Sequence, residues 1–527
     1  MKHLHKYFGR KPPSGVTVSG DAGPGENVVS WRRELCGRTI AVVGDAQMTL
    51  AEPVAPASPA PARGLGEGRL GVLAITFFVI SAAGPLVAMA GGIPVAMLFG
   101  NGAGMPVLFV ALTILLLLFS IGYTAMARRF VNAGAFYALV QAGLGRSAGG
   151  AAGIIALLGY NAMQIALYGL FGTAAGQLAQ ATIGLVLPWW AFALPVALVI
   201  GSLGYRQIDL SVALLGLLCA GEYLVILFLD VAIVTKGGAH GVSLEPFAAR
   251  HVLSGSPMIG LMLGFSAFIG FEATAIYSEE AKDPDRSIPL ATYASVLLIG
   301  VFYAVSTWAL VIGLGTAQTD VLLRAAADPS ELLFGVARQF AGASVEMIMR
   351  CLFVTSIFAG MLAFHNAIAR YCFALGRDGI LFARCGQSHH RHCSPHIGSL
   401  AQTTLALACI VLFAVMGSHP VLTVFAVPTA LGTLAVLVLM VLTSVSIIAY
   451  FLRLPGLRPA IIASSLVAAI GLGAVTLMAT MRFDLMAGAD AGWVVALPLA
   501  ILLAALVGIA RARVVSRLGA ELQRPPR

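Results

Sequence analysis

Two glutamates stand in long apolar stretches of the sequence. Glu272 follows the run FIGF at positions 268–271, and Glu222 follows the run LLCAG at positions 217–221. A charged group in the interior of a membrane costs about 3 kcal/mol or more unless it is paired or hydrated, so each glutamate is a candidate functional residue. A carboxyl group in such a place suits the uptake and release of a proton. For both, a purely structural role stays open, in which the carboxyl group bonds to a neighbouring backbone amide.

Polar side chains also recur at intervals of four residues. Tyr160, Gln164 and Tyr168 share one face if their segment is helical, and that face can line a cavity. The alternative is that Gln164 and Tyr168 hold helices together through hydrogen bonds. His365, in a later apolar stretch, leaves the same choice open, because an isolated intramembrane histidine is often a packed structural residue.

The composition indicates where these residues must lie. The chain has 527 residues, of which 59% are hydrophobic and 10% charged, with a mean hydropathy of +0.92. A soluble domain carries roughly 25% charged residues, so this chain is not a water-soluble globule. Residues 70–127 and 147–205 contain no Asp, Glu, Lys or Arg. Each stretch can hold two membrane crossings of about 20 residues.

The fold class is therefore all-α, because lipid offers no partner to unpaired backbone groups and spanning segments must be helical. We predict a polytopic membrane protein of about 12 transmembrane helices. The predicted spans are 70–99, 104–127, 149–180, 184–204, 209–235, 256–278, 288–315, 346–375, 398–417, 420–450, 459–480 and 491–511.

Lys and Arg in the predicted loops set the orientation. With the N-terminus inside, the inner loops hold eleven of these residues and the outer loops five. This bias predicts a multi-pass protein of the cytoplasmic membrane with both termini in the cytoplasm. The net charge of +9 fits basic loops beside anionic lipid and not a nucleic-acid partner.

The segments outside the spans are expected to form tails. Residues 51–62 (AEPVAPASPAPA) read as an extended Pro/Ala linker in a largely disordered N-terminal tail. Between the start and this linker, residues 31–43 can hold a short strand or helix. The expected domains are a cytoplasmic tail 1–66, a transmembrane domain 67–513 (repeat one 67–236, repeat two 254–453, extra helices 457–512) and a cytoplasmic tail 514–527.

Two of the predicted spans contain helix-breaking residues near their middle. The first has Gly84-Pro85 and Gly91-Gly92, and the sixth has Gly264 and Gly270. Proline removes a helix hydrogen bond, and glycine tolerates non-helical dihedral angles. Paired broken helices in two halves of a transporter predict a binding site near the midplane. Close helix packing is the alternative reason for such glycines.

One loop has residues of metal-binding type. Positions 385–396 read CGQSHHRHCSPH, but the paired spacing of a zinc site is missing, so we expect no metal and no cofactor. The seven cysteines read as free thiols and not as a disulfide framework. The sequence also lacks a phosphate-binding loop, a metalloprotease motif and a nucleophile elbow, so we expect no enzymatic activity.

Three further segments resemble a known family. The runs FSAFIGFE (265–272), EEAKDPDRSIP (279–289) and ALGRDG (374–379) are similar to signatures of the amino acid–polyamine–organocation superfamily of permeases. The resemblance implies a leucine-transporter-type fold, with a 5+5 inverted repeat plus two helices. It also implies that substrate binds between broken helices one and six. The implied substrate-binding residues are Ser81, Ala82, Ala83, Gly84, Pro85, Tyr160, Phe265, Ser266, Ala267, Phe268, Ile269 and Gly270.

The resemblance also suggests roles for the two glutamates. Glu272 matches a glutamate implicated in proton sensing or gating, and Glu222 lies near a position where several members place a lysine. We therefore expect both to act in coupling or gating. In helix one, SAAGPL at 81–86 replaces the family's G-S/T-G, which binds the carboxylate of an amino acid. An amine without that carboxylate is thus an open alternative.

The expected function is secondary transport of amino acids or related amines by alternating access, coupled to protons. The partners are then a small amino acid or amine, protons and membrane lipid. Exchange of one substrate for another is the alternative mechanism, and a non-transporting sensor is a further one. The oligomeric state is not determined by the sequence.

Overall fold

The computed structural model describes residues 31–35, 38–42, 70–130, 132, 134–206, 212–326, 329, 331–389, 392, 394–456, 458–488 and 492–522. Within the expected N-terminal tail, β1 (Trp31–Leu35) pairs antiparallel with β2 (Arg38–Val42), where a short strand or helix was predicted. The other residues of that tail, including the Pro/Ala linker, lie outside the described residues.

The membrane domain is all-α, which confirms the predicted class. Eleven helices within the described ranges are long and apolar enough to cross a membrane. The long helices are α3 (Met105–Ala127), α5 (Arg146–Ile183), α6 (Trp189–Arg206), α7 (Val212–Thr235), α10 (Pro284–Leu314), α13 (Ala343–Arg377), α14 (His396–Val415), α15 (Ala426–Leu452), α16 (Pro459–Met481) and α19 (Pro498–Leu522).

Shorter elements connect and extend these helices. The α-helical ones are α4 (Phe136–Leu144), α8 (Ala249–Val252), α11 (Thr319–Ala325), α12 (Glu331–Ala341), α17 (Phe483–Ala487) and α18 (Gly492–Val495). The 3-10 and π turns are η3 (Gly102–Gly104), η4 (Glu245–Phe247), η7 (Ala383–Gly386) and η8 (Pro420–Phe425). At the end of the chain, α19 runs on to Leu522, past the boundary at 513 expected for the membrane domain.

The first predicted span is broken into separate pieces. Helix α1 (Val72–Ala83) ends at Gly84, which has the left-handed conformation with φ +54°. Pro85 follows, and the chain then continues as the π-helix η2 (Val87–Gly92) and as α2 (Ile93–Phe99). Glycine adopts a positive φ without steric cost, and proline has no N–H to continue the ladder, so the break lies where the sequence places these two residues.

The sixth predicted span is broken as well. It begins as α9 (Pro257–Phe265), tightens into the 3-10 turn η5 (Ser266–Phe268) and resumes as η6 (Phe271–Tyr277). Gly270, with φ +117°, lies between the two turns. Both interruptions coincide with the glycines that the sequence singled out.

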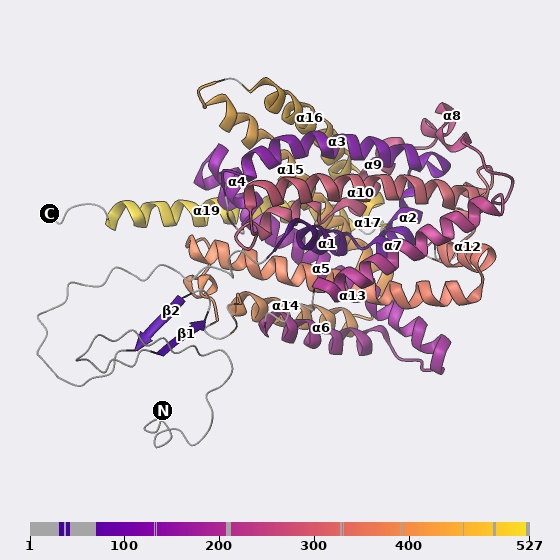
Figure 1. Cartoon of the computed structure of the whole chain (residues 1–527), viewed down its shortest axis with the longest axis horizontal. Coiled ribbons are helices and arrows are strands. Elements are labelled where there is room, and N and C mark those ends of the chain that lie inside the picture. Colours follow the sequence, from indigo (N-terminus) through magenta and orange to yellow (C-terminus); the bar gives the residue numbers. More distant parts are fainter. Residues whose placement is uncertain are drawn as a thin grey trace, which may run out of the picture.

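The broken helices lie inside a layer of unbroken ones. Helix α1 contacts α7, α10 and α13, and α5 packs against α13, α15 and α19. Figure 1 shows α1 near the middle of the bundle, with α10 on one side and α5 and α13 on the other. Both breaks are therefore surrounded by protein, where non-helical backbone is tolerated at membrane depth.

Candidate functional site

The carboxyl group of Glu222 lies at the first break. Its Oε2 atom accepts a 2.6 Å hydrogen bond from the hydroxyl of Ser356 on α13 and a longer one, 3.4 Å, from the backbone N–H of Leu86. Leu86 is the first residue with an amide after the break. Glu222 is 2% exposed. The contact joins α7, α13 and the start of the second half of helix one.

The carboxyl group of Glu272 lies at the second break. Its Oε2 accepts a 2.9 Å hydrogen bond from the N–H of Gly270, and its Oε1 accepts one of 3.0 Å from the hydroxyl of Tyr160 on α5. The hydroxyl of Tyr123 on α3 donates to the backbone carbonyl of the same glutamate, at 2.5 Å. Glu272 is fully buried.

Both glutamates therefore bond to a backbone amide of a broken helix. For each glutamate, the sequence left open a purely structural role in which the carboxyl group bonds to a neighbouring backbone amide. The observed hydrogen bonds have that geometry. Neither carboxyl group forms an ion pair within the described ranges. An uncompensated buried carboxylate is expensive, so the charged form of either group calls for a cationic partner. Structural and coupling roles are thus compatible at these positions.

The two breaks lie against each other. Turn η2 of the first packs on turn η5 of the second. A Cβ atom on Gly92 would lie 3.6 Å from the hydroxyl oxygen of Ser266, which itself donates to the carbonyl of Leu263 at 2.7 Å. A Cβ atom on Gly84 would lie 3.4 Å from the hydroxyl oxygen of Ser356. The structure thus brings spans one and six into contact, through η2 on the C-terminal side of the first break.

Aromatic rings pack around the second break. Phe265, Phe268 and Phe271 are all fully buried. The ring of Phe268 lies 6.1 Å from that of Phe109 on α3 and 6.4 Å from that of Tyr303 on α10, edge-on to the latter. Within the described part of the chain, the buried hydroxyl of Tyr303 has no hydrogen-bond partner.

The other predicted residues divide into three groups. Ala83, Ala267 and Ile269 are buried at the breaks, and Tyr160 reaches Glu272. Ser81 and Ala82 belong to α1, but their side chains are outside the described part. Gln164 and Tyr168 bond to each other, and His365 bonds to Ser399, which are contacts within and between helices.

Three buried charged residues, Asp230, Glu280 and Arg370, were not predicted as site residues. Asp230 on α7 accepts a 2.6 Å hydrogen bond from Ser306 on α10. Arg370 on α13 forms a bidentate ion pair with Glu280, with N–O distances of 2.6 and 3.1 Å. Asp230 interrupts the apolar run 224–234. An acidic residue within an apolar run is the same signal that identified Glu222. Arg370 likewise interrupts an apolar run of the eighth predicted span.

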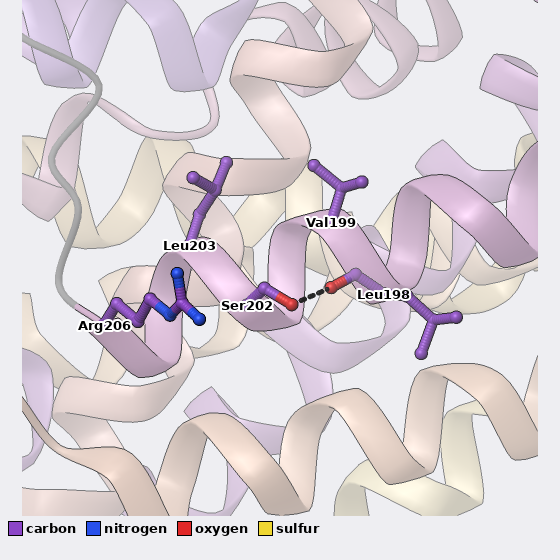
Figure 2. A pocket seen from close by; sticks show the side chains of 5 residues that line it. All are labelled: Leu198, Val199, Ser202, Leu203 and Arg206. Atoms are coloured by element: carbon purple, nitrogen blue, oxygen red, sulfur yellow. Dashed lines mark hydrogen bonds between the residues drawn. The ribbon is translucent and has the colours of Figure 1, made fainter.

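Two other features lie away from the breaks. A surface pocket is lined by residues of α6 alone, among them Ser202, which donates to the carbonyl of Leu198 at 2.8 Å (Figure 2). Because none of these residues belongs to a break, we do not assign the substrate to it. In the histidine-rich loop, His390, Arg391 and Cys393 are outside the described residues. The described His, Cys, Asp and Glu contain no group of three placed to hold a metal.

Comparison with known proteins identifies a family. A family model described as "Amino acid permease" matches residues 77–513. The chain is 23% identical over 319 residues to the low-affinity putrescine importer PlaP of Escherichia coli (strain K12), covering 58% of this chain and 66% of that protein. The chain thus spans just under two thirds of this relative's length.

Two shorter similarities point the same way. Over 154 residues the chain is 30% identical to the branched-chain amino acid permease BcaP of Lactococcus lactis subsp. cremoris (strain MG1363), covering 29% of this chain and 30% of that protein. Over 184 residues it is 27% identical to the cationic amino acid transporter 4 of Homo sapiens, covering 34% of this chain and 27% of the relative.

Proposed function

We propose that this chain, which belongs to the amino acid permease family, is a secondary transporter that carries amino acids or related amines across the cytoplasmic membrane by alternating access. The observation that carries the proposal is the contact between two broken helices in the membrane interior, with a buried carboxyl group at each break. The names of the relatives, which include a putrescine importer and two amino acid transporters, support a small amine or amino acid as cargo.

The proposed binding site lies between the breaks. The segments 81–85 and 265–270, with Tyr160 beside them, would enclose the substrate. Both segments are interrupted by residues with left-handed backbone, Gly84 and Gly270, so each half-helix can change its direction without breaking a long hydrogen-bond ladder. The residues that face the breaks are buried, so substrate entry requires the halves to move apart, which is the motion of alternating access.

Proton coupling is proposed for Glu222 and Glu272. Glu222 bonds to the first break and to α13, and Glu272 bonds to the second break and to α5. Loss or gain of a proton at either carboxyl group therefore changes the contacts between a broken helix and its neighbour. A proton that binds one conformation better than the other shifts the balance between them, and the shift is reciprocal with substrate binding.

The membrane topology belongs to the same proposal. We count the broken first span as a twelfth crossing beside the eleven candidates, which include the broken sixth span Pro257–Tyr277, arranged as a 5+5 inverted repeat plus two helices with both termini in the cytoplasm. In a background without native cysteines, Ser243→Cys, between α7 and α9, is expected to react with an impermeant thiol reagent on intact cells. A cysteine restored at Cys385, between α13 and α14, is expected to react only after lysis.

The experiment that tests the proposal is uptake into proteoliposomes. We expect accumulation of a labelled amine or amino acid, stimulated by an inward proton gradient. Uptake that depends on substrate preloaded inside the vesicles, and not on the gradient, would replace proton coupling by exchange. Binding without any flux would contradict transport and leave only a sensor.

A further inference from the structure

We propose that the substrate is an organic amine without an α-carboxylate, a class defined by the chemistry of the two breaks. The inference rests on the proposed transport function and narrows its substrate. An amino acid brings an ammonium group and a carboxylate to the same site. The breaks of this chain offer two carboxyl groups to the ammonium group, and the backbone amides that flank the breaks already donate to groups of the chain.

Three backbone amides at the first break donate to groups of the chain. The Gly84 N–H donates to the carbonyl of Ile80, and Pro85 has no N–H. The Leu86 N–H donates to Glu222, and the Ala88 N–H donates to the carbonyl of Gly84. The chain's own carboxyl group thus occupies the amide that opens the second half of helix one, where an anion would otherwise bind.

Three amides at the second break also donate to groups of the chain. The Gly270 N–H donates to Glu272, the Ile269 N–H donates to the carbonyl of Ser266, and the Ala273 N–H donates to the carbonyl of Gly270. At both breaks, an incoming carboxylate would have to displace an internal carboxyl group from its amide and remain beside it. Two like charges a few ångströms apart repel strongly in a low dielectric.

Neither break segment carries a basic side chain of its own. The segments 83–92 and 264–272 contain no Lys, Arg or His. The neighbouring α13 contains a buried arginine, Arg370. Its guanidinium donates two hydrogen bonds to Glu280, and its guanidinium carbon lies 5.0 Å from the ring centre of Tyr277. Neither break segment therefore supplies the cationic partner that burial of a substrate carboxylate would need.

An ammonium group finds favourable partners in the same place. Glu222 and Glu272 supply negative charge, and neither is balanced by an ion pair within the described ranges. The buried rings of Phe268, Phe109 and Tyr303 lie edge to face or tilted against one another, and a cation within about 6 Å of such a ring centre is attracted to its face. The unpartnered hydroxyl of Tyr303 can accept from an N–H group or donate to an oxygen, so the preference for an ammonium group rests on the two carboxyl groups and the rings.

The test compares substrates that differ only by the carboxyl group. Purified full-length protein in proteoliposomes is given lysine or cadaverine, ornithine or putrescine, arginine or agmatine, and leucine or isoamylamine. We expect at least one decarboxylated amine to be carried about tenfold faster than its parent amino acid, and to protect the protein more against thermal unfolding. Equal or faster flux of the amino acids contradicts the amine class and leaves transport intact. Neither flux nor binding of any member contradicts both this inference and the proposed function.

Variants at Glu222 then identify the cause of the preference. Glu222→Gln keeps an oxygen for the Leu86 amide but removes the charge, whereas Glu222→Ala removes the charge and exposes the amide. We expect the ratio of amine to amino acid binding to fall in the first variant and to fall at least tenfold in the second. Asp230→Asn is the matched control, because Asp230 is a buried carboxyl group on the same helix that bonds to Ser306 away from the breaks. An unchanged ratio in both Glu222 variants contradicts the assigned role of this carboxyl group.

Discussion

Ser356 on α13 donates a 2.6 Å hydrogen bond to Glu222 on α7, within the first break of the chain. The same hydroxyl lies 3.4 Å from the position that a Cβ atom on Gly84 would take. One serine thus contacts the carboxyl group and the turn of the broken helix together. Movement of that half-helix must change the surroundings of the carboxyl group, which is the physical basis for coupling.

Glu222→Gln is predicted to uncouple transport from protons. The amide side chain retains an acceptor for Ser356 and Leu86 but cannot take up or release a proton. We expect stimulation of uptake by a proton gradient to fall at least tenfold, while exchange between preloaded and external substrate continues. Gradient-driven flux in proteoliposomes measures this, with Asp230→Asn as the control that should stay within about twofold of the native protein. Full gradient stimulation in Glu222→Gln would refute the coupling role.

Gly84→Ala is predicted to destabilise the fold. Gly84 has φ +54°, and an added Cβ would lie 3.1 Å from the side chain of Val87. A non-glycine residue in the left-handed region costs about 1–2 kcal/mol. The control is Gly473→Ala, because Gly473 lies inside α16 with nothing within 4 Å of an added Cβ, and alanine there favours the helix by about 1 kcal/mol. Thermal unfolding in detergent should lower the midpoint for Gly84→Ala alone, and equal midpoints would argue against a required turn.

The hydroxyl groups of Tyr160 and Tyr123 allow a matched comparison at the second break. Tyr160→Phe removes a donor from the carboxyl group of Glu272, whereas Tyr123→Phe removes a donor from its backbone carbonyl. Each loss leaves a buried acceptor less satisfied, at about 1–3 kcal/mol of unfolding free energy. Only Tyr160→Phe is expected to shift the pH profile of uptake. Identical pH profiles in the two variants would contradict a titrating role for Glu272.

The ion pair of Arg370 and Glu280 is predicted to stabilise one end of the bundle. The two side chains are each 7% exposed, and Glu280 immediately precedes Ala281, which forms an isolated parallel β-bridge with Leu70. Arg370→Met leaves Glu280 without this partner and is expected to cost about 3–5 kcal/mol. The double variant with Glu280→Met should recover most of that loss. The control, Arg377→Met, breaks the more exposed contact with Glu279 and should cost about 1 kcal/mol or less.

Part of this site follows from the sequence. The glycines and Pro85 predict the breaks because backbone geometry is encoded locally, and Glu222 and Glu272 stand out because charge is rare in apolar helices. Their partners could not be predicted, since Ser356 comes 134 positions after Glu222 and meets it only through helix packing. The same holds for Tyr303, whose ring reaches Phe268 from another helix. Asp230 could have been found, because it interrupts an apolar run in the same way as Glu222.

We predict that the stability of the loop before the sixth span depends on pH. Hydrogen bonds from His251 and Arg250 lower the pKa of Glu245 below its ordinary value. Because the folded-state pKa of Glu245 is lowered, the contact stabilises the loop at pH values above the ordinary glutamate pKa of about 4.3. This stabilisation is lost as the pH falls through the folded-state pKa. Hydrogen exchange of 249–252, corrected for intrinsic rates, should therefore stay slow at pH 5 and rise in stronger acid. Glu245→Gln should remove this step, and its persistence in the variant would assign it to another group.

A density map of the protein with cadaverine bound, compared with a ligand-free map, tests the central claim most directly. We expect added density between Gly84–Leu86 and Ser266–Gly270, within hydrogen-bond distance of Glu222 or Glu272, and both helices still interrupted. Density at another place, such as the α6 surface pocket, or two continuously wound helices with no space between them, would contradict the account.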